Sequence, residues 1–237
     1  MAYGLIIRNG AGKIVISDDT VAIQVIRTGT LTHAGNIGSP PSMSDSRILQ
    51  LPGGKTRNSL LFMQPKAGQY VSSPRRFTWS GSLPDWGVLS NWTDPVPFFE
   101  CAPAYEITRP KAAWGLEIRA PDGSPRFHSG AELVAFDGHY ARPDLRSVDT
   151  GYYGKGWYHE VNVGNSAWIC PQSAGGSFQE LISNYPPSRR NIQISWAVAR
   201  LTATKCGITR LISRPSTTSN SNAISHAISG TSFFTAE

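Results

Sequence analysis

Apolar and polar residues alternate in short runs along most of this chain, and clusters of Gly, Pro, Asn and Ser separate the runs. In the first run Tyr3, Leu5 and Ile7 share one parity, and a second apolar run starts at Ile14 after an Asn-Gly-Ala-Gly turn. A period of two is typical of a strand with one buried face. The pattern therefore predicts a β-hairpin at the start of the chain.

The same pattern returns without a gap at position 114, which lies 111 residues after position 3. Each copy has one aromatic residue and two glycines as its signature: Tyr3, Gly4 and Gly12, then Trp114, Gly115 and Gly123. Leu116 and Ile118 share the parity of Trp114 and are expected to be buried, whereas Arg8 and Arg119 should face solvent or a partner. Because two strands alone are barely stable, each hairpin is expected to open a larger sheet. Coincidence of two ordinary hairpins is the alternative.

The other apolar runs are also short, which predicts an all-β fold. A capping-box pattern at Ser177 and Glu180 predicts one short helix. Gly53 and Gly54 predict a hairpin turn, and four prolines predict a stiff connector over residues 95–112. We expect two β-sandwich-like domains, each opening with a hairpin, and a polar C-terminal arm that is a loose tail, forms a late strand or orders on a neighbouring subunit. Their bounds are residues 1–108 with the connector, 109–212, and 213–237.

Composition narrows the classes of function. Charged residues are 16% of the chain, below the roughly 25% of ordinary domains. The net charge of +6 comes from Lys and Arg residues that are scattered singly, apart from the adjacent pairs Arg75-Arg76 and Arg189-Arg190. We therefore expect no nucleic-acid partner. Cys101, Cys170 and Cys206 form no Cys-x-x-Cys pair and predict buried free thiols. There is no basic and apolar leader, and no apolar run approaches the about 18 residues that cross a bilayer, so neither a signal peptide nor membrane insertion is expected.

The sequence contains no recognisable catalytic or metal-binding motif. Neither a Gly-x-Ser-x-Gly elbow nor a His-Glu-x-x-His helix occurs, and no glycine loop has the spacing that cradles phosphate. His139 near Asp137 and His159 beside Glu160 are the nearest approach to acid–base groups, and surface pairing explains both. We expect no catalytic residue, no metal and no cofactor, and an enzyme is the least favoured class.

Aromatic residues among small polar ones are the remaining candidates for binding. Trp86 and Trp92 lie in one such segment, and Tyr153, Trp157 and Tyr158 lie in another. If these segments are loops, the rings are candidate contacts for a glycan or a receptor. The alternative is that they pack against the edges of the sheets or the connector.

The first twenty residues resemble the opening of a family of small virion proteins of tailed bacteriophages, with a weaker echo at residues 114–123. The matching elements are Ala2, Tyr3, Gly4, the aliphatic residues 5–7, Asn9 to Gly12, the aliphatic residues 14–16, and Asp18 with Asp19. The resemblance implies a non-enzymatic component of the tail tip, baseplate or fibre, made in the host cytoplasm and located in the virion. It also implies contacts with other tail proteins and a homo-oligomer, for which we expect threefold symmetry. The second half has no clear counterpart in the shorter members of the family.

Two hypotheses follow. In the first, the protein is a structural subunit whose open sheet edges pair with neighbours, because bare edges aggregate. In the second, it binds a receptor or glycan on the host surface through the aromatic segments named above, and several copies add avidity.

Overall fold

The computed structural model shows an all-β protein, as predicted. In the described part of the chain, the 3-10 turn Ala104–Glu106 is the one helical element. The structure describes residues 6–8, 14–17, 21–36, 47–76, 85–106, 115–144, 159–165, 167–172, 176–184, 187–213 and 229–236.

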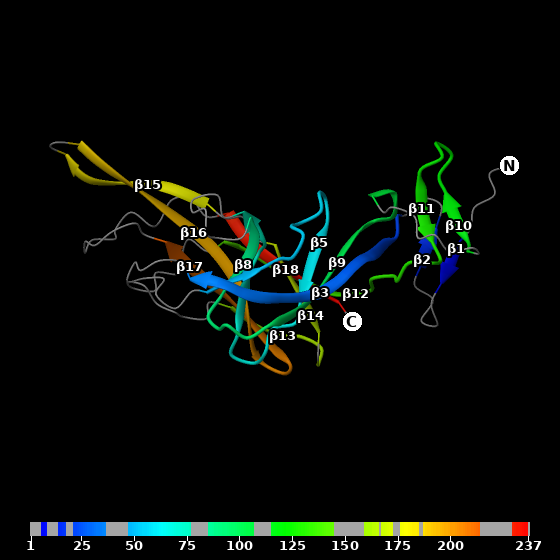
Figure 1. Cartoon of the computed structure of the whole chain (residues 1–237), viewed down its shortest axis with the longest axis horizontal. Coiled ribbons are helices and arrows are strands. Elements are labelled where there is room, and N and C mark those ends of the chain that lie inside the picture. The colour runs from blue at the N-terminus through cyan, green and yellow to red at the C-terminus, as the bar shows by residue number, and fades with distance from the viewer. Residues whose placement is uncertain are drawn as a thin grey trace.

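Eighteen strands account for most of these residues (Figure 1). The strands of the first half are β1 (Ile6–Arg8), β2 (Ile14–Ser17), β3 (Ile23–Asn36), β4 (Arg47–Gln50), β5 (Leu60–Met63), β6 (Tyr70–Ser72), β7 (Arg75–Arg76), β8 (Trp86–Ser90) and β9 (Val96–Pro103). Those of the second half are β10 (Glu117–Arg119), β11 (Pro125–His128), β12 (Phe136–Asp144), β13 (His159–Asn162), β14 (Trp168–Gln172), β15 (Gly176–Asn184), β16 (Pro187–Thr202), β17 (Lys205–Ser213) and β18 (Ser229–Ala236).

Fourteen strands form one sheet, and β1–β2 and β10–β11 form two separate hairpins. The main order is β12-β18-β14-β5-β9-β3-β4-β8-β6-β16-β17-β13, with β15 on β16 and β7 on β8. Strands from both expected domains pair directly, β5 with β14 and β6 with β16. The boundary expected near residue 109 therefore does not separate two sheets, and the pairing gives no support to two sandwiches.

The sheet also curls back on itself. One core cluster joins Ile169 of β14 to Val198 of β16 and Cys206 of β17, with the half-buried Tyr140 of β12 against it. These strands come from opposite ends of the strand order. The curvature follows from the right-handed twist of strands, which accumulates over so many of them.

Residues 96–103 of the expected connector form the central strand β9. It pairs with β3 on one side and β5 on the other, and most of its residues are buried. A strand that is buried on both faces is a continuous apolar run, and Pro97 and Pro103 were misleading. Pro97 lies where the pairing with β5 ends, and its carbonyl accepts a hydrogen bond from the Gln64 backbone N–H at 3.0 Å.

Two local predictions were wrong because tertiary pairing overrode them. Ser177 and Glu180 lie in strand β15, where pairing along β16 replaces the expected helix. Gly53 and Gly54 do adopt positive φ, 70° and 74°, in a turn. That turn does not close a hairpin, because β4 pairs with β3 and β8 while β5 pairs with β9 and β14.

The repeated hairpins are confirmed and share one register. Ile6, Ile7 and Arg8 of β1 lie opposite Ser17, Ile16 and Ile14 of β2, with an irregularity between Ile7 and Arg8. Each position 111 residues further on behaves identically: Glu117, Ile118 and Arg119 lie opposite His128, Phe127 and Pro125, with the irregularity between Ile118 and Arg119. A shared irregularity favours a true repeat over coincidence.

The second hairpin shows which face is buried. Ile118 and Phe127 form a small core with Ala22, and Arg119 is exposed, as predicted. Leu116 is 51% exposed, so its predicted burial was wrong: it lies at the open end of the hairpin, where its backbone bonds to Ser129.

The glycines of the signature are only partly described. Gly123 has a φ of 82° in the turn, and a Cβ on Gly115 would lie 3.1 Å from Ser129 Oγ. Tyr3, Gly4, Gly12 and Trp114 lie outside the described residues.

The segments that leave the two hairpins pair with each other. Gln24 and Leu133 form an antiparallel bridge, the Val134 N–H donates to Ile23 O at 3.0 Å, and the Val25 N–H donates to Glu132 O at 2.8 Å. Ile23 and Val134 are equivalent positions of the repeat. The segments that follow the two hairpins therefore meet antiparallel, with equivalent positions of the repeat opposite one another.

Replacing Phe62 by Ala tests whether the halves share one core. Phe62 stacks on Phe99 at 4.8 Å and belongs to a cluster with Cys170 and Ala236 of the second half. We expect a loss of about 3–5 kcal/mol in the free energy of unfolding and faster amide exchange in both β9 and β14. Urea unfolding and hydrogen-exchange mass spectrometry measure these. If amide exchange rises in the first half alone, the two halves are independent domains. The control is Leu133→Ala, at a 38% exposed site, which should change the free energy of unfolding much less.

Candidate functional site

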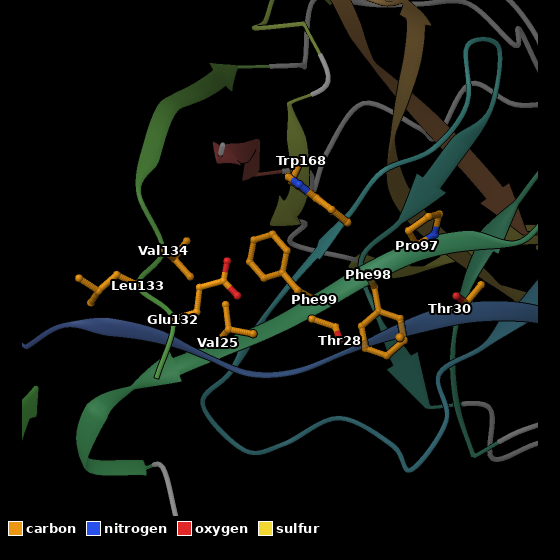
Figure 2. Close-up of a pocket in the computed structure, with 11 residues that line it drawn as sticks. Val25, Thr28, Thr30, Pro97, Phe98, Phe99, Glu132, Leu133, Val134 and Trp168 are labelled. Atoms are coloured by element: carbon orange, nitrogen blue, oxygen red, sulfur yellow. The ribbon is translucent and has the colours of Figure 1, made fainter. Parts of the chain in front are cut away.

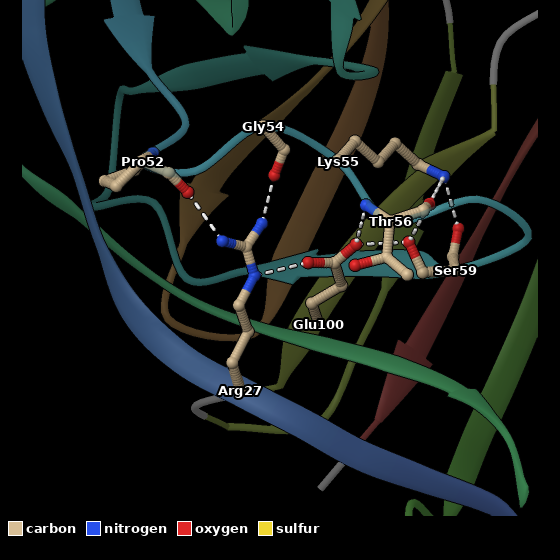
Figure 3. Close-up of polar contacts among 7 residues, drawn as sticks. All are labelled: Arg27, Pro52, Gly54, Lys55, Thr56, Ser59 and Glu100. Atoms are coloured by element: carbon tan, nitrogen blue, oxygen red, sulfur yellow. Dashed lines mark hydrogen bonds and ion pairs between the residues drawn. The ribbon is translucent and has the colours of Figure 1, made fainter. Parts of the chain in front are cut away.

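A buried carboxylate on β9 organises the loop between β4 and β5 (Figure 3). Glu100 is fully buried, and its Oε2 accepts a hydrogen bond from Arg27 Nε at 2.5 Å. Its Oε1 accepts from the Thr56 backbone N–H at 2.7 Å and lies against Ser59 Oγ. The Glu100 carboxylate is therefore paired with the Arg27 guanidinium and accepts hydrogen bonds at both oxygens, as a buried charged group requires.

The guanidinium of Arg27 extends the same network to the loop backbone. Its Nη1 donates to Pro52 O at 2.5 Å, and its Nη2 donates to Gly54 O. Lys55 Nζ donates to Ser59 O at 2.6 Å and closes the loop from the other side. The hydrogen bonds of Arg27 and Glu100 described above go to each other and to the protein's own loop, so we assign this pair a structural role.

The cysteines are buried and free, as predicted. Burial, and then the charges of Cys170 and Glu100, raise the pKa of Cys101 to about 12, while burial raises the pKa of Cys206 to about 11. Thiolates are the reactive form, so neither thiol is suited to nucleophilic chemistry at neutral pH. In the described ranges no group of three or more His, Cys, Asp or Glu side chains could hold a metal ion.

Of the two histidine pairs, the structure describes the side chains of His139 and Glu160. His139 lies on β12 opposite Phe234 and is exposed. Glu160, next to His159 on β13, has its Oε2 3.8 Å from Lys205 Nζ.

The predicted aromatic contacts have different surroundings. Trp86 lies in strand β8 and not in a loop: its ring packs on the core, with the Arg76 guanidinium 5.4 Å from its centroid. Trp92 lies in the bend after β8, is 38% exposed, and rests on the Gly68 turn. Tyr153, Trp157 and Tyr158 lie outside the described residues.

A half-open groove of about 420 Å³ lies over β3 and β9 (Figure 2). Phe99 and Trp168 form an apolar wall, with their ring centroids 5.1 Å apart in an edge-to-face arrangement. Leu133 and the exposed Glu132 lie at one end, and Thr30 lies at the other. Sequence reasoning missed this groove. Gly29 was the available signal, because a glycine inside a strand marks a close approach, and a Cβ there would lie 2.8 Å from the Phe98 ring.

The groove runs along a stretch of β3 whose outer edge has no partner in the described part of the chain. Residues 132–134 cover the edge at Ile23 to Val25, and β4 covers it from Thr32 onward. Thr28, Gly29 and Thr30 lie between them and are exposed. The groove therefore combines an apolar wall with a free row of backbone donors and acceptors.

Four further strands of the sheet pair on one side only in the described part of the chain, namely β7, β12, β13 and β15, and the two long ones are β12 and β15. β12 pairs only with β18, and β15 pairs only with β16, as far as the structure describes their surroundings. Each is nine residues long, whereas natural proteins keep exposed edges short or protected.

No protein-family model, curated protein or solved structure matches this chain. Among the described residues no helix has the length and apolar character needed to span a membrane.

Removing the buried carboxylate should destabilise the protein strongly. Glu100→Ala leaves the Arg27 guanidinium and the Thr56 N–H without their acceptor, so we expect a loss of about 3 kcal/mol in the free energy of unfolding. The exposed pair of Lys66 and Asp94, at 2.7 Å, is the matched control. Asp94→Asn should cost less than about 1 kcal/mol. Equal effects of the two substitutions in urea unfolding would contradict the structural role of Glu100.

Proposed function

We propose that this chain is a non-enzymatic structural subunit that assembles with neighbouring proteins through the open edges of its sheet. The outer strands β12 and β15 carry the proposal. A strand of nine residues at an edge presents a row of N–H and C=O groups that a second strand can pair with. Pairing in a closed assembly protects those edges from uncontrolled aggregation.

The shape of the molecule supports this role. The ribbon of β15 and β16 extends beyond the body of the sheet at one end, and β1–β2 and β10–β11 lie at the opposite end (Figure 1). β16 is 16 residues long, and its first part pairs with β15 while its last part pairs with β6 and β17. Such a ribbon can reach a neighbouring subunit without disturbing the core.

The chemistry described above also supports it. The buried ion pair anchors a loop, and the pKa values of Cys101 and Cys206 are raised away from reactivity. The resemblance of the opening residues to virion proteins of tailed bacteriophages suggests the setting. We propose a tail tip or baseplate, with threefold symmetry and other tail proteins as partners.

Proline substitutions in β15 test assembly through its edge. Adjacent N–H groups of an antiparallel strand point alternately to the partner and away, so one of Gln179→Pro and Glu180→Pro blocks only the outer edge. That variant should fold normally by circular dichroism, and light scattering over a concentration series should show at least about tenfold weaker association, or about 1.4 kcal/mol. The matched control Gln179→Ala should associate as the wild type. A wild-type protein that stays monomeric at every concentration would contradict the proposal.

Binding of a surface glycan is the second candidate, and the exposure of Trp92 favours it. An exposed indole ring offers a stacking face, and repetition in an oligomer multiplies a weak affinity.

Trp92→Ala should then abolish retention on a glycan array without altering the melting temperature. Trp86→Ala, which removes a ring packed on the core, should instead lower the unfolding free energy by about 3 kcal/mol. Retention that survives Trp92→Ala would contradict a role for this ring in binding.

A further inference from the structure

We propose that the groove beside Thr28 and Thr30 accepts an extended polypeptide strand from a neighbouring protein molecule, which adds to the edge of β3. This inference rests on the proposed assembly role for the origin of the strand, and it names the site and the chemistry of the contact.

The direction of the backbone groups follows from Pro97. In an antiparallel sheet the N–H and C=O of one residue point to the same side of its strand. The Pro97 carbonyl accepts from the Gln64 N–H on the β5 side, so it points away from β3. Thr30 lies opposite Pro97, and these two residues therefore exchange no hydrogen bonds. The N–H and C=O of Thr30 therefore point away from β9. Thr28, two residues earlier and opposite Phe99, points the same way. The register shifts between Val25 and Arg27, which turns the Val25 N–H to the same outer edge, where it donates to Glu132 O.

The open stretch has the length of a short strand. It covers residues 26–31, between the edge covered by residues 132–134 and the edge covered by β4. At about 3.3 Å per residue this is roughly 20 Å of free edge. Residues 132–134 and β4 pair antiparallel with β3 on either side of this stretch. An incoming antiparallel strand would fill the gap between them along the same edge.

The groove specifies the side chains of the incoming strand. Phe99 and Trp168 line the face that Thr28 shares, so alternate side chains of the strand would enter an apolar space. Glu132 is exposed at one end and has no ion-pair partner within the described ranges. The site therefore suits aliphatic residues at alternate positions and a Lys or Arg near Glu132. A saccharide would use the rings and the carboxylate but not the row of backbone groups.

Amide exchange in the full-length protein distinguishes these cases. In the free protein the N–H groups of Thr28 and Thr30 should exchange at least about tenfold faster than that of Gly29, which bonds to β9. The probe is a capped peptide of sequence Thr-Val-Thr-Val-Thr-Lys at saturating concentration; in an antiparallel strand its C-terminal Lys lies at the Glu132 end. Added peptide should slow Thr28 and Thr30 and leave Gly29 unchanged, as measured by nuclear magnetic resonance.

Three variants assign the contact. Thr28→Pro removes an outward N–H and should abolish the protection by the peptide, whereas Thr28→Val keeps the N–H and should bind as the wild type. Glu132→Gln should weaken binding and reduce its dependence on salt. If Thr28→Pro does not fold, an N-methylated peptide that cannot donate to β3 serves the same purpose and should not bind.

Three results would overturn the proposal. They are equal protection of Thr28, Thr30 and Gly29 in the free protein, no added protection with saturating peptide, and oligosaccharides that shift the Trp168 signal while the peptide does not. These results do not depend on the β15 variants. If assembly depends on β15 but the β3 edge binds no strand, this inference is wrong and the proposed assembly role stands.

Discussion

Backbone hydrogen bonding across β9 is the constraint on which the rest of this structure depends. β9 pairs with β3 and β5, and its side chains enter two different cores on the two faces of the sheet. Phe98 packs with Leu31 and Val96 on one face, while Phe99 stacks on Phe62 on the other. Because β5 of the first half pairs with β14 of the second half, the core that contains Phe62 and Phe99 joins the two halves of the chain. The groove lies directly over β3 and β9, so the same strand pair holds the core and shapes the candidate site.

Period-two alternation was enough to predict the all-β fold and both repeated hairpins, because a hairpin is a local structure whose register depends on its own turn. The central strand β9 was misread because proline is a local signal, whereas the pairing of β9 with β3 and β5 is decided by residues distant in sequence. The outer strand β15 was misread because a capping pattern was preferred over pairing with the following strand β16. The buried free cysteines were also predicted. The groove was not, because Phe99 and Trp168 are brought together only by the pairing of β5 with β14.

The segments that follow the two hairpins pair antiparallel with each other, with the equivalent positions Ile23 and Val134 opposite one another. The chain therefore covers part of the β3 edge itself. In the described part of the chain β12, β15 and the middle of β3 remain without a second neighbouring strand, and the proposed assembly depends on these edges.

The central claim is that other polypeptides complete these edges. An electron-microscopy map of the particle that contains this chain tests it most directly, at a resolution that traces individual strands. The account predicts a strand of a neighbouring molecule continuing the sheet at β12, at β15 or beside Thr28 and Thr30. A map in which all three edges face only solvent, and neighbours touch the chain through side chains elsewhere, would contradict it.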